Sequence, residues 1–350
     1  MTTDVLIIGG GVIGLATAIE LKLRSLSVTI LVRDFQAGAS HAAAGMLAPE
    51  AEQISPGAML ELCLLSRQLY PDWTSKIEQI SGLSTGFWNC GILAPVYEQT
   101  NRNNAQWLDK SAISKHQPNL SSDVVGGWWY PDDGQVDNRA LTLALRACAI
   151  ALGVIIQDGV TVKNFIHQQN RVTGVCTTTN EIIHAEHYVL ATGAWSQDLL
   201  PIPVHPKKGQ MLSVRATVKE LPLKQVLFGS DIYIVPRADG RIIIGATSED
   251  VGFTPYNTPA GVQLLLQRAI RLYPPLQHYP IEEFWWGFRP ATPDELPILG
   301  ASPYFNLTLA TGHYRNGILL APATANLIAD VITNKTFPLL EHFHYSRFYS

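Results

Sequence analysis

One arginine in the second half of the chain stands among aromatic and apolar residues, an unusual setting for a permanent charge. Arg289 is preceded by the run FWWGF at residues 284–288 and followed by Pro290 and Ala291. A guanidinium on an apolar background can grip a carboxylate through two parallel hydrogen bonds. An arginine that is only ion-paired or stacked on a ring would give the same pattern. The segment therefore indicates either a carboxylate site or a structural arginine.

A glycine pattern at the start of the chain is typical of dinucleotide binding. Gly9, Gly11 and Gly14 form a G-x-G-x-x-G motif between an apolar run at residues 4–8 and a helix-like pattern at residues 12–24. The first glycine makes a tight turn, the second lets the backbone approach a pyrophosphate, and the third lets the helix pack on the strand. The free N–H groups of the helix start favour phosphates. The motif predicts a dinucleotide site, with a structural glycine-rich turn as the alternative.

The end of the second predicted strand leaves the choice of dinucleotide open. An acid that holds the ribose hydroxyls is usual there, but this chain has Val32, Arg33 and Asp34. Arg33 could meet the 2′-phosphate of NADP. Alternatively, Asp34 or the backbone could hold the ribose, or both charges could simply be solvated.

Two further segments could lie against a flat or anionic group. Residues 40–46 read SHAAAGM, and such small side chains allow the backbone to lie against a ring or a pyrophosphate, or a helix to pack closely. Residues 312–318 read GHYRNGI and open a helix-like run at residues 316–333. The start of that helix could stabilise negative charge on a bound group. The histidines and cysteines show no metal-ligand spacing, so no metal is expected.

The elements that position these residues predict an α/β protein with two kinds of sheet. Residues 4–8 and 28–32 read as buried strands of a βαβ unit, and similar runs recur at residues 187–193 and 305–310. Segments such as 241–245 (RIIIG) are of a different type, and they are typical of a mostly antiparallel sheet. We therefore expect a discontinuous cofactor domain with a sheet-rich domain inserted into it.

Composition favours a two-domain protein without a nucleic-acid partner, and the length of its uncharged stretches argues against a membrane span. The chain has 350 residues, of which 15% are charged, with a formal net charge of −4 and so without the excess of basic residues expected of a nucleic-acid binder. Its four cysteines form no C-x-x-C pair, which is typical of thiols in a reducing compartment. The uncharged stretches at residues 5–19 and 316–329 are shorter than the roughly 20 residues that cross a bilayer. A cytoplasmic location is expected.

An ordered set of motifs resembles the D-amino-acid-oxidase-type superfamily of FAD amine oxidoreductases, and within it the glycine oxidases of thiamine (thiazole) biosynthesis. The motifs lie at residues 5–14, 42–47, 134–137, 191–196, 233–237, 245–247, 287–290 and 312–322. The resemblance covers nearly the whole chain and implies a Rossmann-like FAD-binding domain, formed by residues 1–84, 136–204 and 287–350. The inserted, mostly antiparallel substrate domain would be formed by residues 85–135 and 205–286.

The resemblance also implies the residues of the site. Arg289 would salt-bridge the substrate carboxylate, the hydroxyl of Tyr233 would support it, and the backbone of Arg315 would approach the amine. Noncovalent FAD would be bound by Gly9, Gly11, Val12, Ile13, Gly14, Val32, Arg33, Ala39, Ser40, Ala44, Gly45, Met46, Val162, Gly193, His313, Tyr314, Arg315, Asn316, Gly317, Ile318 and Leu319. No cysteine lies near residues 313–319, which argues against a covalent flavin.

The chain departs from the family pattern at three positions. Val32 replaces the usual ribose-binding glutamate, and Asp231 and Ser248 stand where relatives carry histidine and methionine. The first change concerns how the adenosine is held. The other two concern substrate preference, because those positions help to shape the substrate pocket.

The activity implied by the resemblance is oxidative deamination of glycine and other small amines or D-amino acids. A hydride would leave the neutral amine for the flavin, so no side-chain base is required, and O2 would be reduced to H2O2. The imine would hydrolyse to glyoxylate or pass to a thiazole synthase. The alternatives are a membrane-linked D-amino-acid dehydrogenase or sarcosine-oxidase-like enzyme of the same fold, and a flavin-binding partner protein without turnover. A homo-oligomer is expected.

Overall fold

A six-stranded sheet forms the half of the molecule in which the chain begins. The computed structural model describes residues 3–99, 105–216 and 221–349. The sheet has the order β18-β19-β12-β1-β2-β8, and all its pairs are parallel except β18 with β19. Its strands are β1 (Thr3–Ile8), β2 (Val28–Val32), β8 (Ile155–Asp158), β12 (Ala185–Leu190), β18 (Ile298–Ala301) and β19 (Leu307–Thr311). The central strands are runs of apolar residues because both faces of this sheet are covered.

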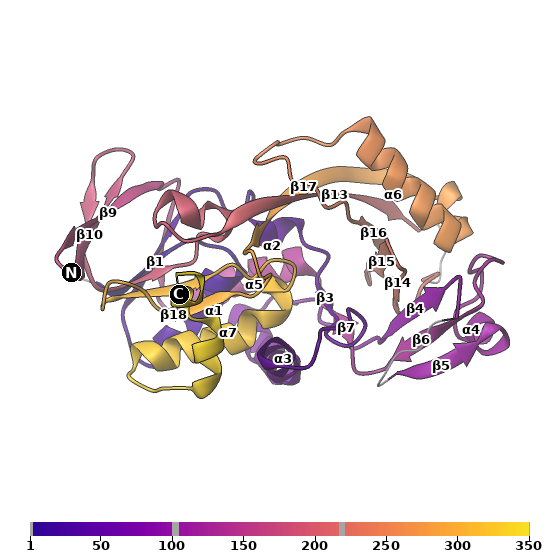
Figure 1. Cartoon of the computed structure of the whole chain (residues 1–350), viewed down its shortest axis with the longest axis horizontal. Helices are drawn as coiled ribbons and strands as arrows, with labels where there is room; N and C mark the ends of the chain where they lie inside the picture. Colours follow the sequence, from indigo (N-terminus) through magenta and orange to yellow (C-terminus); the bar gives the residue numbers. More distant parts are fainter. Residues whose placement is uncertain (1–2, 100–104, 217–220, 350) are drawn as a thin grey trace.

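Four helices pack together on one side of this sheet (Figure 1). They are α1 (Val12–Leu23), α3 (Ala58–Ser81), α5 (Asn138–Ala151) and α7 (Gly317–Ile332). The three-stranded sheet of β9 (Val162–Gln168), β10 (Arg171–Thr177) and β11 (Ile182–Ile183) contributes Phe165 and Val175 to the core on the other side, beside Leu6 and Leu190. α1 and α7 both start at the carboxyl ends of strands, β1 and β19, where ligands bind in folds of this type.

An eight-stranded sheet forms the other half, in the order β17-β13-β16-β15-β14-β4-β6-β5. It is antiparallel except between β14 and β4. Its strands are β4 (Ile92–Val96), β5 (Gln106–Asp109), β6 (Gly126–Tyr130), β13 (His205–Arg215), β14 (Val226–Phe228), β15 (Tyr233–Pro236), β16 (Arg241–Gly245) and β17 (Ile281–Ala291). Helix α6 (Pro259–Leu272) packs on its outer face, and the long strands β13 and β17 reach back toward the first half (Figure 1).

Short elements connect the two halves. α2 (Ala39–Ala42) follows β2, and β3 (Met46–Leu47) then pairs with β7 (Gly134–Gln135). The remaining elements are α4 (Lys110–His116) and the 3₁₀ helices η1 (Gly193–Asp198), η2 (Pro274–His278), η3 (Pro338–Phe343) and η4 (Tyr345–Phe348).

The predicted fold class, α/β with a second and mostly antiparallel sheet, is confirmed. The strand expected at residues 187–193 ends at Leu190, because the chain then turns into η1. The domain boundaries stay a prediction, and the one drawn after residue 286 falls inside β17. All four cysteines are free thiols. Within the described ranges, the helices are too short or too polar to span a membrane.

Candidate cofactor and substrate site

One cavity of about 1000 Å³ brings most of the predicted site residues together. Its wall includes Gly9–Ile13 at the start of α1 and Val160–Lys163 before and at the start of β9. It also includes Tyr233 of β15, Arg289 of β17 and Arg315, which lies just before α7. The volume is at the upper end of the range for ligand cavities in proteins.

The glycine motif has the shape that a bound pyrophosphate requires. Gly9 has a φ of +116°, and a Cβ atom on it would lie 2.3 Å from the carbonyl oxygen of Ala191. A Cβ on Gly14 would lie 1.9 Å from the carbonyl oxygen of Gly9, so this glycine lets α1 pack on the turn. A Cβ on Gly11 would have only Ser40 Oγ within 4 Å, at 3.2 Å. The space over Gly11 therefore belongs to the cavity, and the residues present fit a dinucleotide.

The start of α1 faces this space with little capping of its own. Gly11 stands at the N-cap position and offers no side chain, and the Val12 N–H donates to Ser40 Oγ at 2.9 Å. The partial positive charge of a helix start attracts an anion. This end of the cavity is therefore suited to phosphate.

The residues at the end of β2 have partners of their own. Val32 is buried against the glycine turn, where a Cβ on Gly10 would lie 2.4 Å from its Cγ2. The guanidinium of Arg33 lies 4.1 Å from the centre of the Trp195 ring. Asp34 accepts a hydrogen bond from the Gln36 N–H at 2.9 Å. Because Arg33 stacks on Trp195, its charge is already stabilised without a 2′-phosphate.

A buried arginine fixes the small-residue segment that lines the middle of the cavity. Arg237, which follows β15, donates to the carbonyl oxygens of Ala44 at 2.7 Å and Val136 at 3.2 Å. It also donates to the side chains of Gln135 and Asn138. Burial lowers its pKa to about 10, which still leaves it charged at neutral pH. Arg237 thus connects the cavity-lining backbone at Ala44 with β15 of the eight-stranded sheet, with β7 and with the start of α5.

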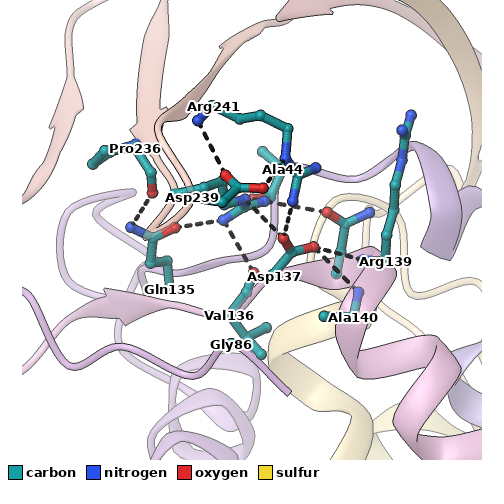
Figure 2. Close-up of polar contacts among 12 residues, drawn as sticks. Ala44, Gly86, Gln135, Val136, Asp137, Arg139, Ala140, Pro236, Asp239 and Arg241 are labelled. Carbon is teal, nitrogen blue, oxygen red and sulfur yellow. Dashed lines mark hydrogen bonds and ion pairs between the residues drawn. The ribbon is translucent and has the colours of Figure 1, made fainter. Parts of the chain in front are cut away.

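Asp137 balances this charge and caps α5. Its carboxylate lies 2.6 Å from Arg241 and 3.8 Å from Arg237, and it accepts from the N–H groups of Arg139 and Ala140 (Figure 2). Burial would raise the pKa of Asp137, but the two arginines and the backbone hydrogen bonds lower it below its usual value. Asn138 extends the network by donating to the carbonyl oxygens of Ser40 and His41 at 2.8 and 2.9 Å.

Tyr233 and Arg289 share a wall at the far end of the cavity, and glycines make room for both. A Cβ atom on Gly209 would lie 2.7 Å from the Arg289 guanidinium nitrogens. A Cβ atom on Gly245 would lie 2.6 Å from the Tyr233 hydroxyl oxygen. One guanidinium nitrogen of Arg289 donates to the carbonyl oxygen of Thr247 at 3.2 Å. Burial raises the pKa of Tyr233, which therefore keeps its proton and can donate to an anion. The pair can bind a carboxylate.

The start of α7 closes the cavity beside this wall. Asn316 occupies the N-cap position without a capping side-chain hydrogen bond, and Gly317 and Ile318 line the cavity. His313 lies under this turn, with Nε2 3.2 Å from Thr324 Oγ1. Burial lowers the pKa of His313 to about 3, so the ring is neutral at physiological pH. The free N–H groups of the helix start leave a positive potential here.

Three residues predicted to bind the cofactor do not line the cavity. Gly14 packs against Gly9, Leu319 is buried in the helical core, and Asn316 occupies the N-cap position of α7. Each helps to position a neighbour that does face the cavity. The predicted residues that do line it are Gly9, Gly11, Val12, Ile13, Val32, Arg33, Ala39, Ser40, Ala44, Gly45, Met46, Val162, Gly193, Tyr233, Arg289, His313, Tyr314, Arg315, Gly317 and Ile318.

Sequence reasoning missed several residues of the wall. Glu52, Trp195 and Met211 line the cavity but were not predicted as site residues. Glu52 lies in a turn without a motif, so only the fold brings it to the site. Asp231, one of the positions that depart from the family pattern, also lines the cavity and forms an ion pair with Arg268 at 2.7 Å. The described residues contain no cluster of three His, Cys, Asp or Glu side chains that could hold a metal ion.

The glycine turn, the helix start and the cavity that runs to an arginine wall define a dinucleotide-binding α/β protein with room for a small anionic substrate. The chain belongs to the FAD dependent oxidoreductase family (DAO), whose sequence pattern matches residues 4–331. The predicted FAD cofactor and oxidoreductase class are thereby confirmed, and NADP is set aside.

Within this family, the chain is similar to proteins of two names, ThiO/ThiG and glycine oxidase. The chain is 66% identical to the "Bifunctional protein ThiO/ThiG" of Trichormus variabilis, with 99% of this chain and 55% of that protein aligned. It therefore spans about half the length of that relative. It is 36% identical to the glycine oxidase of Geobacillus kaustophilus, with 95% and 93% of the two chains aligned. The crystal structures of glycine oxidases from Geobacillus kaustophilus and Bacillus cereus both superimpose with a TM-score of 0.92, at 33% and 31% identity over 99% of each chain.

Proposed function

We propose that the protein is a glycine oxidase, which oxidises glycine and other small amines or D-amino acids with FAD and O2. The observation that carries the proposal is the wall formed by Tyr233 and Arg289, with space held open for both by Gly209 and Gly245. A carboxylate held there would bring the substrate's Cα close to the middle of the cavity. The identity to glycine oxidases over nearly the whole chain supports the same conclusion.

We further propose that the FAD lies along the cavity, with its pyrophosphate over Gly11 and its ring beside residues 313–318. Support comes from the open space over Gly11 and from the two helix starts that face the cavity. Val162 would contact the adenine end. On this basis the six-stranded half, residues 1–84, 136–204 and 287–350, would carry the cofactor, and residues 85–135 and 205–286 would form most of the substrate wall.

The chain's own residues would bind and orient the substrate. Arg289 would pair with the carboxylate, and the Tyr233 hydroxyl would donate to it. The carbonyl of Thr247 orients the guanidinium, so the substrate meets a preformed donor pair. When bound, FAD would supply the redox chemistry, as the hydride acceptor between the amine and O2, with H2O2 as the reduced product. The helix start at Gly317 would stabilise negative charge beside it.

The imine product would either hydrolyse to glyoxylate or pass to a thiazole synthase. Support for the transfer comes from the relatives named ThiO/ThiG, which this chain matches over about half of their length. We propose a cytoplasmic enzyme that assembles with copies of itself.

Peroxide formation from small amino acids tests the proposal. The purified protein should be yellow, should release its flavin on acid treatment, and should form H2O2 and glyoxylate in equal amounts from glycine. Sarcosine and small D-amino acids, each against its enantiomer where one exists, define the substrate range. Flavin reduction by glycine without oxygen uptake would instead favour the dehydrogenase. A protein that does not react with glycine at any pH would overturn the proposal.

A further inference from the structure

Among the described residues, the Glu52 carboxylate has no hydrogen-bonding partner although it lies near the Arg289 and Arg315 guanidinium groups. Glu52 lines the cavity with Tyr233, Arg289 and Arg315. Within the described part of the chain, its side chain makes no hydrogen bond and no ion pair within 4 Å. The other acids nearby are already paired: Asp231 binds Arg268, and Glu249 accepts from Gln210 and lies 3.5 Å from the Lys208 ammonium.

Ion pairs and hydrogen bonds of Arg67 and Asp133 hold the turn that carries Glu52 in place. Arg67 of α3 lies 2.6 Å from Glu50 and 2.5 Å from Asp133, and Asp133 accepts a hydrogen bond from the Ala51 N–H at 2.8 Å. The Glu52 N–H donates to the carbonyl oxygen of Ala48 at 3.0 Å. These bonds engage the carboxylates of Glu50 and Asp133. The Glu52 carboxylate takes no part in them and lines the cavity instead. Glu52 is therefore not needed to hold the turn together.

Charged and titratable groups from three elements and two loops act on Glu52. Arg315 and Arg289 favour its charged form, from the loop before α7 and from β17, while Asp133 disfavours it. Tyr233 of β15 and Cys63 of α3 also lie within its electrostatic reach. Burial is the largest effect and raises the pKa of Glu52 to about 7 despite the two arginines. Such a group can both accept and release a proton near neutral pH.

Hydride transfer from the neutral amine needs no side-chain base, but the arriving substrate must first become that neutral amine. A free amino acid arrives with an ammonium group, and its Cα–H bond can be oxidised to an imine only when the nitrogen has a lone pair. The two guanidinium groups disfavour the ammonium form, because a nearby like charge lowers its pKa, but they have no lone pair that could accept its proton. A carboxylate can accept it. A substrate with its carboxylate on Arg289 would have its nitrogen one carbon away, within a part of the cavity where Glu52 and Arg315 act on each other electrostatically.

We propose that Glu52 is the residue that binds the substrate ammonium and accepts its proton. In this step an N–H bond breaks, an O–H bond forms on the Glu52 carboxylate, and the nitrogen keeps the electron pair. No oxidant takes part, and no base is needed at Cα. The inference rests on the proposed glycine oxidase function, to which it adds the group that accepts the ammonium proton.

The pH dependence of kcat/KM for glycine tests this role. In wild type, kcat/KM should rise to a plateau as pH passes about 7, where Glu52 titrates. In Glu52→Gln this limb should disappear, and activity should instead follow the more alkaline ionisation of the amine. At pH 7 the variant should lose roughly 100-fold or more in kcat/KM, with a smaller loss at alkaline pH. Flavin content should stay the same.

Two further variants separate this role from a structural one. Glu52→Asp keeps a carboxylate and should retain the limb near neutral pH with a partial loss of rate; it also provides the readout if the amide does not fold. Glu61→Gln makes the same chemical change at an exposed position of α3 and should keep the wild-type profile. A Glu52→Gln enzyme with the wild-type pH profile would overturn the inference alone. A wild type that oxidises no glycine at any pH would overturn the proposed function, and the inference with it.

Discussion

The Arg289 guanidinium lies directly over Gly209, so that a Cβ atom on this glycine would stand 2.7 Å from both of its Nη atoms. The two residues lie on the neighbouring strands β17 and β13, where Gly209 pairs with Gly287. A side chain at position 209 would therefore occupy the space in which the arginine presents its hydrogen-bond donors.

Substitution Gly209→Ala should impair catalysis while leaving the fold intact. The added methyl group meets the end of a flexible side chain rather than backbone, so the guanidinium shifts and the strands do not. A displacement of about 1 Å in a positioning group can cost on the order of 100-fold in rate. We expect kcat/KM for glycine to fall by about 10- to 100-fold, with flavin content and melting temperature unchanged. Wild-type kcat/KM would show that Arg289 does not position the substrate.

Alanine substitutions at two glycines of the motif should affect different properties, FAD binding in one case and folding in the other. In Gly11→Ala the methyl group enters the cavity and meets only Ser40 Oγ at 3.2 Å, so the protein should fold but bind FAD at least about tenfold more weakly. In Gly14→Ala it would lie 1.9 Å from the Gly9 carbonyl oxygen, so the protein should unfold or aggregate. Circular dichroism and flavin titration distinguish the two. Equal effects on folding would refute the assignment of Gly11 to the pyrophosphate.

Removing the buried Arg237 should destabilise the protein and weaken FAD binding together. Arg237→Met leaves the carbonyl of Ala44 without its donor and Asp137 without one of its two arginines. Loss of one partner of a buried ion pair costs about 3–5 kcal/mol. The same substitution in an Asp137→Asn background should cost less, because asparagine still caps α5 and carries no charge. Thermal unfolding with and without added FAD measures both effects. If the losses in unfolding free energy of Arg237→Met and Asp137→Asn simply add in the double variant, the two residues are not coupled.

His187 should make the free energy of unfolding depend on pH. Burial lowers its pKa to about 4, and its Nε2 lies 2.8 Å from Thr308 Oγ1. The unfolded residue binds a proton below about pH 6.5, whereas the folded one does so only near pH 4, so its stabilising contribution is complete above 6.5 and is lost as pH falls. Relative to His187→Gln, wild type should lose about 1.4 kcal/mol for each pH unit between those values. Urea unfolding at pH 7 and pH 5 checks this, and parallel losses in the two proteins would contradict it.

Helices, strands and turns whose pattern lies within one continuous stretch of sequence could be predicted. β2 and β16 fall on the predicted runs 28–32 and 241–245, and the helix expected over residues 316–333 is α7 (Gly317–Ile332). Each is marked by a continuous apolar pattern and by glycine or polar residues at its start or end. The glycine turn could be placed because strand, turn and helix follow one another directly.

The substrate end of the cavity was predicted less completely, because distant segments form it. The apolar setting of Arg289 marked it as a candidate, and the family resemblance added Tyr233. The need for Gly209 and Gly245 beside them depends on strand register. Glu52 reaches the site only because Arg67 and Asp133, which are far from each other in sequence, hold its turn. An isolated glutamate in a turn has no pattern that would distinguish it from a surface residue.

Anaerobic mixing with glycine tests the central claim most directly, since it follows flavin reduction without the later reaction with oxygen. The flavin of the wild-type protein should lose its visible absorbance when glycine is added, and oxygen should then restore it. Arg289→Met should keep its flavin but remain coloured at the same glycine concentration, because the carboxylate has no partner. A wild-type flavin that glycine does not bleach, or an Arg289→Met flavin that bleaches at the wild-type rate, would contradict the account.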